Sequence, residues 1–265
     1  YYEDGRTVRM MQLSKLSGVK VTRPSPLFTL DGGLFQTFRS HSQLEIAGRR
    51  PEGGWSWQNR GESTGYHELD AMLDTDLPRG AILSLNLAPG INSAMALLVL
   101  SGIIGPGNSR SRATFFRPFE GIGVERARGV LGELTLIEEA SPRAEMSASS
   151  GRAESLSGQV RKLNGARRGK KVVALTGSEF LLDPSGDGDR DRLLEVMRSE
   201  IDLSVLVSGD DASHESAARI ADVSLKLSEI NGTPLLKGEL PWTEYFVIDM
   251  KVDRNRATVG LVPMV

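Results

Sequence analysis

The fold is decided by the stretch Leu87-Ala88-Pro89-Gly90-Ile91-Asn92-Ser93-Ala94. An apolar run at 81–85 precedes this stretch, and a second apolar run at 95–100 follows it. The order predicts a buried strand, a tight turn around Pro-Gly and a helix. Backbone N–H groups at the start of such a helix can bind a phosphate, so the layout is typical of a phosphate-binding loop.

The side chains that such a loop needs are missing from this stretch. The loop pattern is G-x-x-x-x-G-K-[ST], in which the lysine contacts phosphate and the hydroxyl binds Mg²⁺. Leu87 and Asn92 stand where the pattern has its two glycines. Ser93 stands at the lysine position and Ala94 at the hydroxyl position. The sequence therefore predicts the backbone of a nucleotide-binding loop without its chemical groups.

Two further runs carry a family resemblance. One is Ser63-Thr64-Gly65-Tyr66-His67-Glu68-Leu69-Asp70-Ala71-Met72-Leu73, with Leu77-Pro78-Arg79-Gly80 after it. It resembles the "S-T-G-x-x-x-L-D-x-x-L … L-P-R-G" opening of KaiC-type domains in the RecA superfamily, which includes archaeal and bacterial ATPases. The run at 220–227 resembles the "I-A-D-x-x-x-x-L" close of the same domains.

The order of elements predicts an α/β fold. Strand-like and helix-like runs alternate through most of the chain, and the segment from 220 to 265 reads as successive strands. This order predicts a mostly parallel central sheet with antiparallel strands added at one edge. The resemblance implies the same architecture, namely a RecA-like P-loop fold with helices on both faces and a β-rich C-terminal edge.

ATP hydrolysis on this fold requires a lysine, a hydroxyl that binds Mg²⁺, an aspartate at a strand end and a glutamate that positions water. The apolar strand at 172–175 leads into Thr176, at the place of the aspartate (the Walker B position). Glu120 is the remaining catalytic candidate, near the family's catalytic glutamate. Loss of the lysine contact and the metal ligand removes about 3–6 kcal/mol, or roughly 10²- to 10⁴-fold in nucleotide affinity.

We divide the chain into three parts. Residues 1–46 resemble the β-rich tail of an upstream RecA-like domain, or are an N-terminal extension of this one. Residues 47–62, rich in Gly and Pro, are typical of a linker, and 63–265 form the KaiC-like domain. Lys15 matches the lysine that reaches a neighbour's ATP in multimeric family members. A solvated lysine on an edge strand is the alternative interpretation of Lys15.

Composition excludes several classes of protein. An apolar content of 39% and a charged content of 25% are those of a soluble globular protein. The net charge of -2 argues against a nucleic-acid partner. The absence of cysteine excludes disulfides and fits a cytoplasmic location, and no apolar run is long enough to span a membrane. No metal site is expected, because the histidines lack partners at ligand spacing.

The leading hypothesis is a pseudo-ATPase, a KaiC/RecA-like domain with a regulatory or assembly role. It would be the second repeat of a larger signalling protein and would self-associate or dock on a sister RecA-like domain. A competing hypothesis is an ATPase with an unorthodox loop, using ATP, Mg²⁺ and Glu120, with Lys170 or Lys171 as a substitute cation. Two more hypotheses are a gas-vesicle regulator of the GvpD type and a relative of DNA recombinases.

Overall fold

The structure is a computed structural model, which describes residues 2–14, 25–38, 50–51, 66–73, 77–104, 112–131, 134–136, 151–166, 171–182, 187–253 and 256–265. The strands are β1 (Tyr2–Glu3), β2 (Arg6–Thr7), β3 (Phe28–Thr29), β4 (Gln36–Thr37), β5 (Arg50–Pro51), β6 (Ala81–Leu87), β7 (Arg112–Phe116), β8 (Thr135–Leu136), β9 (Lys171–Gly177), β10 (Leu203–Ser208), β11 (Val223–Ile230), β12 (Thr233–Leu240), β13 (Tyr245–Asp253) and β14 (Arg256–Pro263). The helices are η1 (Asp31–Gly33, a 3-10 turn), α2 (His67–Leu73), α3 (Ser93–Ile104), α4 (Val124–Leu131), α5 (Gly151–Ala166), α6 (Glu179–Leu182), α7 (Asp187–Glu200) and α8 (Asp211–Ala218).

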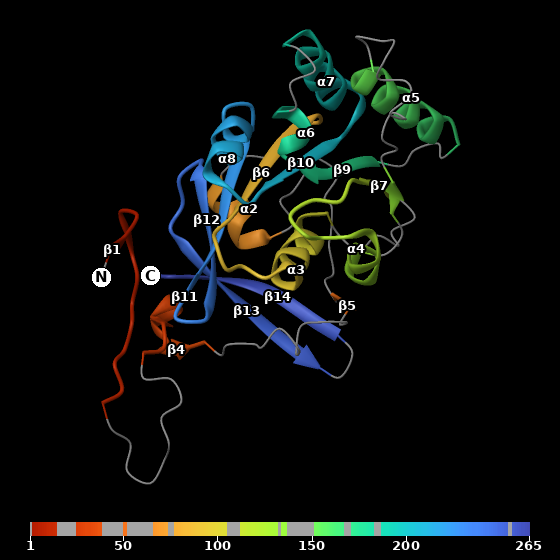
Figure 1. Cartoon of the computed structure of the whole chain (residues 1–265). Helices are drawn as coiled ribbons and strands as arrows, with labels where there is room; N and C mark the ends of the chain where they lie inside the picture. The colour runs from red at the N-terminus through yellow and green to blue at the C-terminus, as the bar shows by residue number, and fades with distance from the viewer. Residues whose placement is uncertain are drawn as a thin grey trace.

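Ten strands form one sheet in the order β5-β14-β13-β12-β11-β6-β10-β9-β7-β8. The strands from β11 to β8 in this order run parallel, whereas β12, β13 and β14 are joined to β11 by antiparallel pairs. The antiparallel strands, blue in Figure 1, make up one end of the sheet. The predicted α/β fold class, mostly parallel with an antiparallel C-terminal edge, is confirmed.

Strand β6 lies in the interior of the sheet and is buried along its whole length. Leu83, Leu85 and Leu87 point to one face, where they pack with helices α3 and α4. Ile82 points to the other face, which α5, α6, α7 and α8 cover. Burial on both faces is typical of a parallel strand and explains the near-continuous apolar run. Helix α3 is also buried, from Met95 to its end.

The N-terminal segments cover the antiparallel end of the sheet. Val8, Leu27 and Phe38 are buried against residues of β12, β13 and the chain end, including Tyr245 and Val247. The alternating run from 7 to 13 predicts a longer strand than the structure has. Strand β2 ends at Thr7, and beyond it the run makes one isolated bridge, between Met10 and Leu27. Of the predicted linker, the described residues 50–51 form β5, beside β14.

The amino edge of the sheet is built by the runs that carry the family resemblance. The Pro78 carbonyl accepts a hydrogen bond from the Ala81 N–H at 3.0 Å, which closes a turn just before β6. Gly80, the third residue of this turn, has φ = +80°. Type II turns place glycine at this position because φ is positive there. A side chain at Gly80 would also overlap the backbone carbonyl of Arg198.

Two aspartates close the amino ends of parallel strands. Asp222, just before β11, accepts hydrogen bonds from the Ile82 N–H at 2.8 Å and the Arg198 guanidinium at 2.7 Å. Asp202, just before β10, accepts from the Val172 N–H at 2.7 Å. The backbone N–H of Asp222 also donates to the Ile82 carbonyl, and the backbone N–H of Asp202 donates to the Val172 carbonyl. The two carboxylates therefore extend the strand ladders at the amino edge. Among the described residues, no helix is both long and apolar enough to cross a membrane.

Candidate functional site

The connections of the sheet diverge between β6 and β10. From β6 the chain passes through α3 to β7, on one side of β6, and from β10 it passes through α8 to β11, on the other side. Ligands of open α/β sheets bind at the carboxyl ends of the strands where the connections diverge in this way. The residues that leave these two strands are 88–92 and 209–210. The topology alone therefore makes this edge the candidate site.

The predicted strand, turn and helix are confirmed at residues 81–104. Strand β6 ends at Leu87 and helix α3 begins at Ser93. Gly90 has φ = +92°, which the turn requires of it. The Asn92 side-chain oxygen accepts a hydrogen bond from the Met95 N–H at 2.9 Å and so caps α3. One of the first N–H groups of the helix is therefore already bonded within the chain.

Ser93, at the lysine position of the loop pattern, contacts a cation from another helix. The Arg126 guanidinium, on α4, donates a hydrogen bond to the Ser93 hydroxyl. A positive charge is thus present at the start of α3 although the loop carries none of its own. Arg126 was not among the residues predicted from the sequence, because it lies 33 residues away and belongs to no part of the loop pattern.

Glu120 lies on the same edge and faces the end of β10. Its backbone has φ = +43°, and its carboxylate accepts a hydrogen bond from the Gly209 N–H at 3.1 Å. A side chain at Gly209 would overlap this carboxylate. Glu120 therefore lies at the carboxyl edge of the sheet. In this structure it is bonded to the backbone just beyond β10.

Residues 117–126, which we name the crossing segment, run from β7 to α4 over the carboxyl ends of three strands. The Arg117 guanidinium lies 4.8 Å from the centre of the Phe180 ring, on α6 directly after β9. Glu120 bonds to the backbone after β10, and Arg126 bonds to Ser93, after β6. Three charged side chains of the crossing segment therefore contact residues just beyond the carboxyl ends of three neighbouring strands. The crossing segment thus forms part of the candidate site.

Thr176 lies inside β9, one residue before its end, because the strand continues through Gly177. The sequence predicted a strand that ends in Thr176; the observed strand ends one residue later, and Thr176 pairs with Leu206. Thr176 is buried, and its hydroxyl donates to the Gly177 carbonyl at 3.3 Å. The carboxylate near this strand end belongs to Glu179, which lies against Gly177 and which no sequence pattern identified.

Of the two lysines proposed as substitute cations, the structure describes Lys171, and it does not reach this edge. Lys171 is the first residue of β9 and lies at the amino edge of the sheet. A seven-residue strand places it about 20 Å from the strand exits. Lys170 and Lys15 lie outside the described residues, as does the segment 63–65. Within the described ranges, no group of three or more His, Asp or Glu side chains could hold a metal ion.

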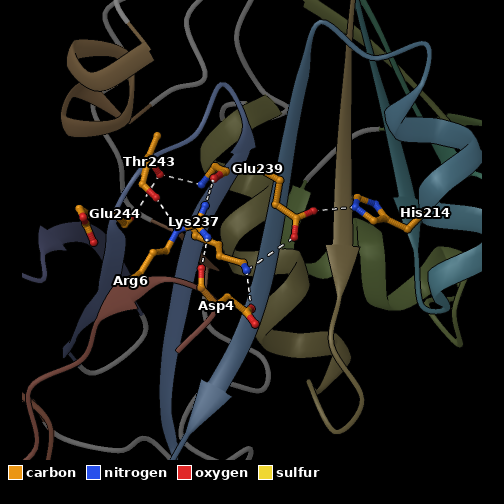
Figure 2. A network of polar contacts seen from close by, with 8 residues as sticks. Asp4, Arg6, His214, Lys237, Glu239, Thr243 and Glu244 are labelled. Carbon is orange, nitrogen blue, oxygen red and sulfur yellow. Dashed lines mark hydrogen bonds and ion pairs between the residues drawn. The ribbon is translucent and has the colours of Figure 1, made fainter. Parts of the chain in front are cut away.

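A second polar cluster joins α8 to the N-terminal hairpin, which we define as residues 2–7 (Figure 2). His214 Nε2, on α8, lies 2.7 Å from a carboxylate oxygen of Glu239, on β12. Lys237 Nζ lies 2.6 Å from Asp4 in the hairpin and 3.6 Å from Glu239. Arg6 donates to the Gly238 and Thr243 carbonyls at 2.6 Å each. No sequence pattern marks this cluster, because its members lie up to 237 residues apart.

The pKa values of the two carboxyls are lowered. The hydrogen bond from His214 lowers the pKa of Glu239, outweighing partial burial, and the hydrogen bond from Lys237 lowers the pKa of Asp4. A carboxyl with a lowered pKa stabilises the folded state above its unfolded pKa, and this stability is lost as the pH falls through the folded pKa. Asp4 therefore holds the hairpin to Lys237 at neutral pH and releases it in acid, whereas Glu239 stabilises the contact between α8 and β12.

We expect the N-terminal hairpin to loosen as the pH falls below about 4, the region where unperturbed Asp and Glu protonate. Amide exchange of residues 2–7, corrected for the intrinsic pH dependence, measures this loosening. Asp4→Asn, which does not titrate, should show a weaker dependence on pH. Equal protection of the hairpin at pH 6 and pH 3 would contradict the expectation.

Comparison with protein-family models gives no match. Among curated proteins, the chain is similar to Protein GvpD1 of Halobacterium salinarum, with 33% identity over 103 residues. This similarity covers 37% of the chain and 19% of GvpD1, so the chain spans about a fifth of that protein's length. Among solved structures, a KaiC-like protein from Pyrococcus horikoshii OT3 matches with a TM-score of 0.48 and 13% identity, covering 76% of this chain and 98% of that one.

Proposed function

We propose that this chain is a KaiC/RecA-type domain without ATPase activity, which serves a regulatory or assembly role in a larger signalling protein. The observation that carries the proposal is the state of the loop between β6 and α3. Its backbone has the predicted bend, but Ser93 stands at the lysine position and is bonded to Arg126, while Asn92 caps the helix. Thr176, at the Walker B position, uses its hydroxyl for a backbone carbonyl.

The magnitude of these changes favours a pseudo-ATPase. A lysine on the phosphates and a hydroxyl on Mg²⁺ each contribute a charge-assisted interaction of about 1.5–3 kcal/mol. Their joint loss weakens nucleotide binding by roughly 10²- to 10⁴-fold. Phosphoryl transfer depends almost wholly on positioning and electrostatic stabilisation, and both need the cation and the metal. Glu120 alone supplies neither.

A second candidate function is favoured by Arg126. A guanidinium at the start of α3 can form two parallel hydrogen bonds with a phosphate and can supply the charge that the loop lacks. In this second candidate function the domain binds a nucleotide without Mg²⁺, and Arg126 must move from Ser93 to the phosphate. It keeps the hypothesis of an ATP-binding domain with an unorthodox loop, with Arg126 in place of the lysines at 170 and 171.

Among the regulatory roles, the similarity to GvpD1 supports a GvpD-like regulator, and the net charge of -2 disfavours a DNA-recombinase relative. The partner proposed for the chain is a second copy or a sister RecA-like domain, because RecA-type domains bury their loop against a neighbour. This point rests on analogy between folds. Light scattering coupled to size exclusion, with and without ATP, measures the association.

Isothermal titration with ATP, in the presence and absence of Mg²⁺, tests the proposal. We expect no Mg²⁺-dependent saturation, with any binding at least roughly 100-fold weaker than for an intact loop. Binding without Mg²⁺ that Arg126→Ala abolishes would establish the second candidate. The matched control is Arg128→Ala, on the same helix, where Arg128 pairs with Glu125 at 2.9 Å. A micromolar, Mg²⁺-dependent dissociation constant would refute the pseudo-ATPase proposal.

A further inference from the structure

We propose that Lys237 is a two-position cation that holds or releases the N-terminal hairpin, and that His214 on α8 sets its position. In the structure Lys237 is bound to the hairpin, through Asp4, while its second carboxylate partner, Glu239, is held by His214. The proposal concerns a conformational device and does not depend on whether the loop binds a nucleotide.

Lys237 is a buried ammonium that must keep a carboxylate partner. Its side chain is 4% exposed, and Nζ lies 5.6 Å from the centre of the Tyr245 ring. A charge in such a place is stable only when it is paired. Two carboxylates are within reach, Asp4 at 2.6 Å and Glu239 at 3.6 Å. Lys237 can therefore exchange one partner for the other without becoming unpaired.

Glu239 is kept from Lys237 by His214. One of its carboxylate oxygens lies 2.7 Å from His214 Nε2, and the other is the oxygen 3.6 Å from Lys237 Nζ. Because an ionised carboxylate only accepts hydrogen bonds, His214 donates through Nε2. Figure 2 shows Glu239 between the imidazole and the ammonium, with dashed lines to both. If the imidazole moves away, the remaining attraction draws Glu239 towards Lys237.

The ion pair with Lys237 is one of the attachments of the hairpin. Asp4 is the acidic residue through which the hairpin binds Lys237, and its own side chain is 55% exposed. Another attachment is Arg6, which is buried, bonds to two carbonyls and lies 4.7 Å from the centre of the Trp242 ring. When Lys237 is drawn to Glu239, the hairpin loses the Asp4 ion pair and keeps the two hydrogen bonds of Arg6.

Helix α8 connects this device to the candidate site. Gly209, whose N–H binds Glu120, and Asp210, whose side chain caps the helix through the Ser213 N–H, immediately precede α8. His214 lies one turn further along the same helix. A change at the end of β10 that displaces α8 therefore moves the imidazole relative to Glu239. The hairpin is the segment that responds.

If Asp4 and Glu239 compete for Lys237, substitutions of the contacting residues His214 and Glu239 should have opposite effects on the hairpin. His214→Leu frees Glu239 to compete for Lys237, so we expect the amide exchange of residues 2–7 to rise by up to roughly fivefold, the factor for one partly exposed ion pair. Glu239→Gln removes the competitor, so exchange should stay equal to the parent or fall. The double variant should return to the parent value, because Lys237 again has one carboxylate partner.

The fluorescence emission of Trp242 gives a second measure of hairpin release, because the Arg6 guanidinium of the hairpin lies near its ring. The other two tryptophans are replaced in a Trp55→Phe and Trp57→Phe background. The matched control is Glu215→Gln, which removes an exposed ion pair with Arg219 on the same helix and should leave the hairpin unchanged. His214→Gln should keep the hairpin closed, since its amide can donate to Glu239. Exchange of the α8 amides tells whether His214→Leu has unfolded the helix.

Two results would overturn the proposal. One is a Glu239→Gln hairpin that exchanges as fast as the His214→Leu hairpin, because His214 and Glu239 would then merely support the fold together. The other is a double variant that stays as fast as His214→Leu alone. If α8 itself unfolds in His214→Leu, then His214→Gln compared with Glu239→Gln decides. If each of the single variants His214→Gln and Glu239→Gln loosens the hairpin, the proposed competition between Asp4 and Glu239 for Lys237 is contradicted.

Discussion

Replacement of Gly80 by alanine is expected to lower the melting temperature by on the order of 10 °C. Two costs add at this position. Positive φ costs a non-glycine residue about 1–2 kcal/mol, and Gly80 has φ = +80°. A Cβ would also lie 2.9 Å from the carbonyl carbon of Arg198, and closer still to its oxygen. Overpacking of this kind costs about 1–3 kcal/mol, so the total is about 2–5 kcal/mol.

Gly33→Ala separates the two costs. Gly33 has φ = +75°, close to the value of Gly80, but a side chain there has open space within 4 Å. This variant should lose only the conformational cost of about 1–2 kcal/mol. Thermal unfolding followed by circular dichroism measures both variants. Equal losses for Gly33→Ala and Gly80→Ala would show that the contact with Arg198 is unimportant.

Asp222→Ala is expected to destabilise the fold by about 2–4 kcal/mol, because it leaves a buried N–H without its acceptor. The carboxylate binds the Ile82 N–H, at the start of the central strand, and the Arg198 guanidinium. Ile82 itself is fully buried, which limits the access of water to its N–H. Denaturant unfolding measures the loss as a lower midpoint with an unchanged slope.

Asp222→Asn is the matched control. Its amide oxygen keeps an acceptor for the Ile82 N–H and loses only the charge that faces Arg198, so about 1 kcal/mol is expected. The Asp222–Arg198 pair is partly exposed, with side chains 31% and 45% accessible, which keeps this charge contribution small. An asparagine variant as unstable as the alanine variant would show that the ion pair, and not the backbone bond, closes this strand.

The sequence predicted the elements whose physics is local. The apolar run of β6 and the Pro-Gly bend before α3 were predicted, because burial on both faces and turn chemistry leave a pattern in neighbouring residues. The antiparallel end of the sheet was predicted from successive strand-like runs. The end of β9 was misplaced by one residue, since Thr176 fits a strand as well as a strand end.

The candidate site was only partly predictable. Glu120 and the loop positions were found because they stand at fixed distances from recognisable strands. Arg126 and His214 gained their surroundings through tertiary contacts with residues far away in the chain. No single-sequence pattern encodes such pairings. For the same reason Lys171 was an incorrect choice of cation, because its end of the strand is fixed by the strand's direction.

Gly80 and Asp222 lie at one end of the strands, and the bend at Ser93 lies at the other. A change in the loop at Ser93 is therefore separated from Gly80 and Asp222 by the full length of the strands. The proposed loss of loop chemistry is compatible with an intact fold, because the residues that close the amino edge are different ones. The same separation offers a protein engineer a scaffold in which the turn between β6 and α3 can be rebuilt without altering the contacts of Gly80 and Asp222 at the opposite edge.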